Sequence, residues 1–176
     1  MKNQKSTINN QTSIRGFSLI EVLIATLLIG LSIAALMAAN GSFSMANVAG
    51  ADLSTAEFLI EQIRELTMML PVADPAVTTW TTLGPESGET TVAMYDDVDD
   101  LKGFDSATLG APISAQRTPL PDLAAFRQTV TVQKLNPTNF DETWADNSSS
   151  NFVRITVTIW QSGRSISSAS WVRARY

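Results

Sequence analysis

The feature of this sequence that most constrains its fold is a run of 18 residues without a charge, from Val22 to Ala39. A run of this length is sufficient for a helix to cross the hydrocarbon core of a membrane. The apolar segment begins at Phe17 and contains one acid, Glu21, close to its start. A carboxylate within such a segment costs roughly 2.5–3.5 kcal/mol at the bilayer centre, so a functional role and a positively charged partner are expected for it. We therefore expect residues 17–39 to form a transmembrane helix.

Residues 1–16 form a polar leader that contains Lys2, Lys5 and Arg15 but no acid. The positive-inside rule predicts that this leader stays in the cytoplasm and that the chain beyond the helix lies on the other side of the membrane. A secretory signal peptide explains the leader less well, because no A-x-A-like cleavage site ends a short apolar core. A simple signal anchor is the alternative that remains.

The sequence Gly16-Phe17-Ser18-Leu19-Ile20-Glu21 resembles the signal of type IV prepilins and of type II secretion minor pseudopilins. The resemblance covers residues 10 to 40 approximately. It implies that a prepilin peptidase cleaves after Gly16 and that the new N-terminal residue, Phe17, is N-methylated. It also implies that Glu21 pairs with the N-terminal amine of a neighbouring subunit in a filament.

Residues 17–70 predict one long helix of about 80 Å, because no proline occurs before Pro71. Gly30 and the stretch Asn40-Gly41-Ser42 are its expected weak points. Residues 40–70 continue the helix with an amphipathic pattern, in which apolar residues recur at spacings of three and four. They are Leu53, Ala56, Ile60, Ile63, Leu66 and Leu70. This face is expected to pack on the chain's own head, and a coiled coil with a partner is the alternative.

Residues 71–176 are expected to form a loop-rich head with a small antiparallel sheet. Proline and glycine are frequent up to Pro121, which favours loops there, with one short strand at 89–94. Trp80, Phe104 and Leu109 are expected to hold these loops on the sheet. Alternation of apolar and polar residues predicts three consecutive strands, within 122–135, 151–160 and 165–175, joined by a polar connection at 136–150 and a turn at 161–164. The predicted fold is α+β, with the long N-terminal helix laid across the sheet as in type IV pilins.

The acidic string in the head contains Asp96, Asp97, Asp99 and Asp100. Carboxylates grouped in this way could bind Ca²⁺ through their oxygens, although the EF-hand pattern fails because Leu101 stands at a ligand position and no Glu ends the loop. The other hypothesis, which we favour at this point, is a loop whose acids face water. Tyr95, Val98, Leu101 and Phe104 would then anchor it. The string also resembles a segment of minor pilins of the mannose-sensitive haemagglutinin type.

The composition argues against an enzyme and against a nucleic-acid binder. The chain has no His and no Cys, so no Ser-His or Cys-His pair can form and no cofactor is expected. Its net charge is −5 and becomes −8 once the leader is removed, which disfavours direct contact with nucleic acid. Tryptophans on a sugar-binding surface are a minor alternative.

The expected function is that of a minor pilin or pseudopilin, a structural subunit of a type IV pilus-like filament for adhesion, motility or DNA uptake. A pseudopilin of a type II secretion system and a calcium-dependent adhesin on the same anchor are the alternatives. The expected partners are the prepilin peptidase, other pilin subunits, the inner-membrane assembly platform and the membrane itself. The expected location is the inner membrane, with a single pass and a periplasmic head, followed by the pilus or pseudopilus.

Overall fold

The computed structural model describes residues 16–75 and 80–175. Helix α1 runs from Leu19 to Met69, within two residues of the limits expected from the sequence. It is continuous at Gly30 and at Asn40-Gly41-Ser42, so the expected weak points do not interrupt it. Most of the leader, residues 1–15, lies outside the described residues.

The first half of α1 belongs to an N-terminal unit that ends at Asn47, and all of the described residues of this unit are exposed. The hydroxyl groups of Thr26 and Ser32 donate to the carbonyl oxygens of Leu23 and Leu28, at 2.9 and 2.7 Å. These bonds satisfy the polar side chains inside the helix itself. By length and composition, α1 can cross a membrane.

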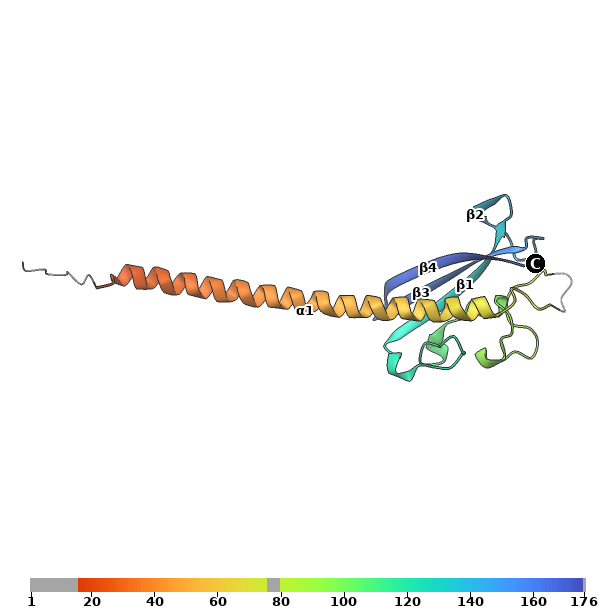
Figure 1. Ribbon diagram of the computed structural model, residues 1–176, viewed down its shortest axis with the longest axis horizontal. Helices are drawn as coiled ribbons and strands as arrows, with labels where there is room; N and C mark the ends of the chain where they lie inside the picture. The colour runs from red at the N-terminus through yellow and green to blue at the C-terminus, as the bar shows by residue number, and fades with distance from the viewer. Residues whose placement is uncertain (1–15, 76–79, 176) are drawn as a thin grey trace, which may run out of the picture. The chain divides into compact units, whose positions relative to one another are not determined.

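The C-terminal unit begins at Val48 and contains a four-stranded antiparallel sheet. Its strands are β1 (Phe126–Asn136), β2 (Asn139–Thr143), β3 (Phe152–Gln161) and β4 (Arg164–Ala174), in the order β2-β1-β3-β4. The last part of α1 runs beside β1 and β3 (Figure 1). The fold class is therefore α+β, as the sequence predicts.

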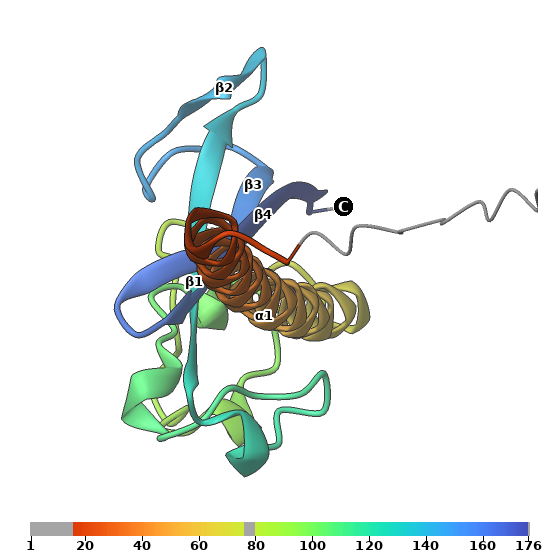
Figure 2. The ribbon, with the colours of Figure 1, turned by 90° about the vertical axis from the view of Figure 1, so that its left-hand side faces the viewer.

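Short 3-10 helices interrupt the loops between α1 and β1. They are η1 (Val92–Met94), η2 (Asp99–Leu101), η3 (Ser106–Thr108) and η4 (Pro121–Leu123). Figure 2 shows the β1–β2 hairpin at one end of the sheet and most of the loop segments, in green, towards the other. The turn between β3 and β4 has positive φ at Ser162 (50°) and Gly163 (77°), which suits a tight two-residue hairpin and confirms the predicted turn.

The core of the C-terminal unit forms where one face of α1 meets the apolar face of the sheet. The helix contributes Ala56, Leu59, Ile60, Ile63 and Leu66, all at most 2 % exposed. The sheet contributes Phe126, Val130, Val132, Val153, Ile155, Val157 and Ile159. The expected helix face is thus largely confirmed, but Leu53 was wrongly included and is 47 % exposed. Leu59 takes a place in the core that the predicted pattern omitted.

Two predictions about strands are wrong. The strand expected at 89–94 does not form, and η1 occupies the end of this segment. Residues 103–105 pair instead with β1, at Thr129 and Val130. There Gly103 N donates to Val130 O, and Val130 N donates to Phe104 O, at 3.2 and 3.0 Å. The second error is β2, which forms within the expected polar connection. All five of its residues are exposed, so no apolar alternation marks it in the sequence.

Of the residues expected to hold the loops, Trp80 and Phe104 are buried at 7 % exposure, whereas Leu109 is 42 % exposed. Leu109 follows η3 at the surface, so the prediction for this residue is wrong. Val98 and Leu101 are fully buried, and Tyr95 packs against the core as a half-buried residue. The main anchors of the acidic string are therefore confirmed.

A buried glutamine joins three parts of the head. Gln128 lies on the inner face of β1 and is fully buried. Its Nε2 donates to Leu59 O on α1 at 2.9 Å, and its Oε1 accepts from Ile113 N in the loop region at 3.0 Å. Buried polar groups need such partners, so this side chain links helix, strand and loop.

We expect Gln128→Leu to lower the free energy of unfolding by about 1–3 kcal/mol, because it leaves the buried Ile113 N–H without an acceptor. Urea unfolding of a fragment spanning residues 48–176, followed by circular dichroism, measures this effect. The control is Gln133→Leu on the exposed face of the same strand, which should change stability by less than about 0.5 kcal/mol. Equal effects of the two substitutions would contradict the linking role of Gln128.

Candidate functional site

The first candidate site is the start of α1, where the sequence predicts cleavage, methylation and assembly residues. Gly16 and Phe17 precede the helix, and Phe17 is 88 % exposed. Glu21 lies in the first turn, and its Oε2 accepts hydrogen bonds from Ser18 N at 2.8 Å and Ser18 Oγ at 3.0 Å. In return, Ser18 Oγ accepts from Glu21 N at 3.3 Å.

This reciprocal arrangement is a capping box, in which a serine and a glutamate three residues later satisfy each other's backbone N–H groups. The role predicted for Glu21 from the sequence is assembly, and that prediction does not include the cap seen here. The S-x-x-E spacing before an apolar run is the signal that could have revealed it. The acid therefore has a local partner that stabilises the start of the helix and lowers the cost of its position.

The apolar surface that follows has no cover from the described part of the chain. Side chains such as Leu27, Leu31 and Leu36 are 61–64 % exposed, and no residue of the membrane-spanning window is buried. Exposed apolar surface of this extent requires lipid or other helices around it. The beginning of α1 is thus a candidate for membrane insertion or for helix association.

The second candidate site is the acidic string in the head. Its acids were expected to face water, and for three of them this expectation is wrong: Asp97, Asp99 and Asp100 are at most 1 % exposed. Only Asp96 is exposed. The burial of these acids follows from their neighbours. Val98 and Leu101 enter the core, and η2, which ends at Leu101, draws the aspartates in with them.

The loop is held in place through backbone bonds at both ends. Val98 N donates to Pro71 O, immediately after α1, at 2.9 Å. Gly103 has a φ of +77°, which glycine adopts without strain, and this allows the chain to turn from η2 into its pairing with β1. The acids are therefore placed between the end of the helix and the outer side of β1.

Two groups of carboxylates result from this placement. The first group has four members, each of which contributes one carboxylate oxygen, and these oxygens all lie within 4.8 Å of one another. They come from Glu86, Asp97, Asp99 and Asp100. Oxygens of Glu89, Asp96 and Asp100 form a second group of the same kind. Glu86 and Glu89 were not among the predicted site residues, because they lie outside the Asp string and only the folded loop brings them to it.

The clustering and burial of these acids raise their pKa values. Loss of solvent raises the pKa of Asp97 to about 8, and repulsion by Asp99 and Asp100 adds to this shift. The pKa of Asp100 rises to about 7, again chiefly because of burial. Burial also raises the pKa of Asp99, although a hydrogen bond from Trp80 opposes the change. Partial loss of solvent and the neighbouring Glu89 raise the pKa of Glu86 to about 7.

A buried tryptophan and lysine lie behind the acids. Trp80 Nε1 donates to Asp99 Oδ2, and Trp80 O accepts from the Nζ of Lys134 on β1. Lys134 is fully buried, lies 4.5 Å from the centre of the Trp80 ring and also donates to Ser148 O at 2.9 Å. Burial lowers the pKa of Lys134, while the charges of Asp146 and Asp99 oppose this shift. The lysine and tryptophan thus tie the acidic loop to the sheet.

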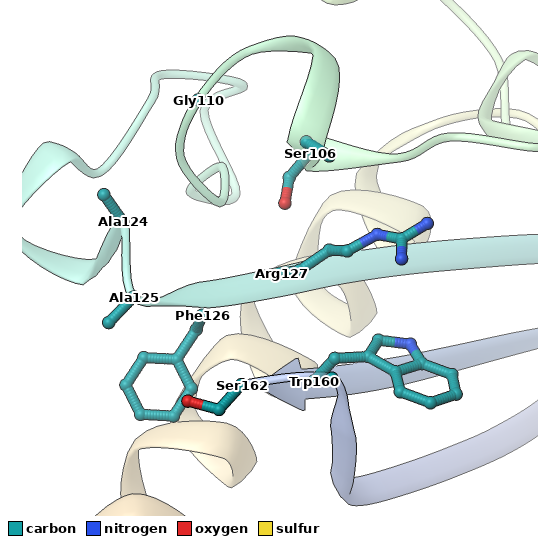
Figure 3. A pocket seen from close by; sticks show the side chains of 10 residues that line it. Ser106, Gly110, Ala124, Ala125, Phe126, Arg127, Trp160 and Ser162 are labelled. Carbon is teal, nitrogen blue, oxygen red and sulfur yellow. The ribbon is translucent and has the colours of Figure 1, made fainter.

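A hollow of about 410 Å³ also lies in the head, between the loop segments and the first residues of β1 (Figure 3). Arg127 is the only charged residue among those that line it. Its Nε donates to Asp105 Oδ1 at 2.8 Å and its Nη2 donates to Asp105 Oδ2, which lowers the pKa of Asp105. The charge of Arg127 is therefore already neutralised, and the hollow offers no acid–base pair among its lining residues.

Comparison of this chain with protein-family profiles, with curated proteins and with solved structures finds no match. The two sites therefore rest on their residues and geometry. The first brings Gly16, Phe17 and Glu21 together at the start of an uncovered apolar helix. The second places three of the four predicted aspartates inside the head.

We expect Trp80→Phe to lower the free energy of unfolding by about 1–3 kcal/mol more than Trp171→Phe does, because Asp99 loses a buried donor. Trp171 is a matched control, since its Nε1 is buried without a hydrogen-bond partner among the described residues. Urea unfolding of the 48–176 fragment, followed by far-ultraviolet circular dichroism, gives both values. Equal losses would show that the bond between Trp80 and Asp99 contributes nothing to stability.

Proposed function

We propose that this protein is a minor pilin or pseudopilin, a structural subunit of a type IV pilus-like filament. It is inserted in the inner membrane with its head in the periplasm, cleaved after Gly16, and methylated on Phe17. A prepilin peptidase, other subunits and an inner-membrane assembly platform are its partners. The same features suit a pseudopilin of a type II secretion system, and both machines build filaments from subunits of this kind.

One observation carries this proposal. An apolar helix, without cover from the described residues over its first half, begins three residues after Gly16 and has a single acid, Glu21, in its first turn. Both features match the prepilin-like sequence Gly16-Phe17-Ser18-Leu19-Ile20-Glu21. The α+β head, with its own core, is compatible with a pilin. The lack of His and Cys in the chain supports a structural role over a catalytic one.

Assembly places a charged amine, from the cleaved N-terminus, among apolar helices. An unpaired amine or an unpaired carboxylate there is costly, and pairing Glu21 with the Phe17 amine of a neighbour removes both costs. The capping bonds use Oε2 of Glu21, so Oε1 can accept a bond from that amine. The acid can therefore keep its local cap and also set the axial position of the incoming subunit.

The neighbouring genes distinguish the two machines. A gene for a retraction ATPase beside this one favours a pilus, whereas a secretin with other pseudopilins and no retraction ATPase favours secretion.

The first prediction of this proposal is that Gly16→Ala prevents cleavage, because a Cβ at this position obstructs approach of the peptidase to the backbone. Mass spectrometry of the membrane fraction should show mature wild-type protein that begins at a methylated Phe17, and uncleaved precursor for the variant. Gly30→Ala is the control, since no atom lies within 4 Å of a Cβ added there. Cleavage of Gly16→Ala at the normal rate would refute the proposed processing.

The second prediction concerns the charge of Glu21. Glu21→Gln keeps an acceptor for the cap but removes the charge, so cleavage should remain normal while incorporation into filaments falls. Loss of one partner from a buried pair costs about 3–5 kcal/mol, which corresponds to a decrease of roughly 100-fold or more. The measurement compares the processed protein in membranes with that in sheared filaments.

Ser18→Ala is the matched control for this experiment, because it removes the hydroxyl group of the cap and keeps the carboxylate. It should enter filaments normally. If Glu21→Gln were incorporated as well as the wild type, either the subunit would sit only at the tip, where one neighbour is missing, or the pairing would not occur.

A further inference from the structure

The buried aspartates of the head lack the partners that buried charges require. None of Glu86, Asp97, Asp99 and Asp100 forms an ion pair with Lys or Arg among the described residues. Lys102 pairs with Asp146, and Arg117 donates to Tyr95 O. The charge of Lys134 acts on Asp99, but its Nζ donates to Trp80 O and Ser148 O and forms no ion pair with the acids. One buried lysine that acts on Asp99 alone does not balance four clustered carboxylates, so an additional positive group is expected at this position.

The hydrogen bonds of these acids leave particular oxygens free. Oδ1 of Asp97 accepts from the backbone N of Asp99 and of Asp100, at 2.8 and 3.3 Å. Oδ2 of Asp100 accepts from the backbone N of Asp96 and of Asp97, at 3.0 and 3.2 Å. The other oxygens, Asp97 Oδ2 and Asp100 Oδ1, are buried and have no hydrogen-bond partner among the described residues. Asp97 and Asp100 are thus each held by the backbone through one oxygen and leave the other for a ligand. Both oxygens of Asp99 already accept a hydrogen bond, from Trp80 Nε1 and from Gly84 N, and an oxygen that accepts one bond can still bind a cation.

We propose that Glu86, Asp97, Asp99 and Asp100 form a Ca²⁺ site in the loop region between α1 and β1. This site goes beyond the filament role proposed above. The position of the site outside the cytoplasm rests on that proposed function. Extracellular modules use Ca²⁺ sites of modest affinity.

The ligand set selects a hard cation. It contains only carboxylate oxygens, and the chain has neither His nor Cys to bind a softer metal. Two oxygens that bind one Ca²⁺ at 2.3–2.6 Å can be at most about 5 Å apart, and the four oxygens here lie within 4.8 Å of one another. For Mg²⁺ the corresponding limit is about 4.2 Å, and this ion also retains several waters, which a buried site accommodates poorly.

Binding at this site has a structural consequence. Glu86 belongs to the segment that follows Trp80, whereas Asp97, Asp99 and Asp100 surround η2. A shared cation would join these two segments and would offset the mutual repulsion of the acids. It would also fix η2 where residues 103–105 pair with β1. The cation would thus hold the two loop segments together, as apolar contacts hold the sheet against α1.

The test uses the full chain in detergent micelles, stripped of metal with a chelator and then supplied with Ca²⁺ or Mg²⁺. At a free Ca²⁺ concentration 100 times Kd, the unfolding equilibrium constant should fall about 100-fold, which raises Tm by roughly 5–10 °C. Isothermal titration calorimetry should show one Ca²⁺ per chain. No response to Ca²⁺, or an equal response to Mg²⁺ at the same concentration, would overturn the proposal.

Asp97→Asn and Glu86→Gln identify the ligands. Asparagine keeps the oxygen that accepts the backbone bonds of Asp97, so this variant should fold, and Glu86 is exposed, so its replacement should also fold. Both should lose the Ca²⁺-dependent rise in Tm, whereas Asp141→Asn, an exposed acid on β2, should retain it. If Asp97→Asn and Glu86→Gln kept the full response, the site would be wrong. The assay needs neither cleavage nor filaments, so its failure leaves the filament proposal unaffected.

Discussion

The head of this protein depends on one apolar contact, between a face of α1 and a face of the sheet. Ile60 and Ile63 are fully buried on the helix side, as are Ile155 and Val157 on the strand side. Complete burial of each such side chain stabilises the fold by about 1.5–3 kcal/mol. An antiparallel sheet with one apolar face needs a cover, and the last turns of α1 supply it. The loops and the remaining strand are arranged around this contact.

Polar groups inside the head are satisfied by partners from distant parts of the chain. Gln128 joins α1 to the loop region, and Lys134 donates to two carbonyl groups beside the Trp80 ring. Arg173 on β4 donates to the carbonyl groups of Thr67 and Leu70. It thereby supplies a positive charge at the C-terminal end of α1, whose last turn contains no basic residue. Asp97 and Asp100 differ, because each keeps one buried oxygen without a hydrogen-bond partner among the described residues.

The beginning of α1 faces the opposite constraint, because it exposes apolar surface without any cover from the described chain. The Ser18–Glu21 cap satisfies the backbone at its start and holds the acid beside the first turn. In the proposed function, a membrane or neighbouring helices supply the remaining contacts. In the proposed filament, the head folds through its own core, while the first half of the helix is stabilised only by its surroundings.

The sequence by itself determined the elements that depend on local spacing: the limits of α1, the strands β1, β3 and β4, and the turn at Ser162-Gly163. Periodicity and turn residues act over a few positions, so they can be read without a structure. The tertiary structure alone decided that β2 pairs with β1, that Gln128 is buried, and that Glu86 meets Asp97. These outcomes depend on contacts between residues far apart in the chain. For the acids, burial followed from the anchoring of Val98 and Leu101, which the sequence predicted, but the number of hydrogen-bond partners inside the fold could not be inferred from it.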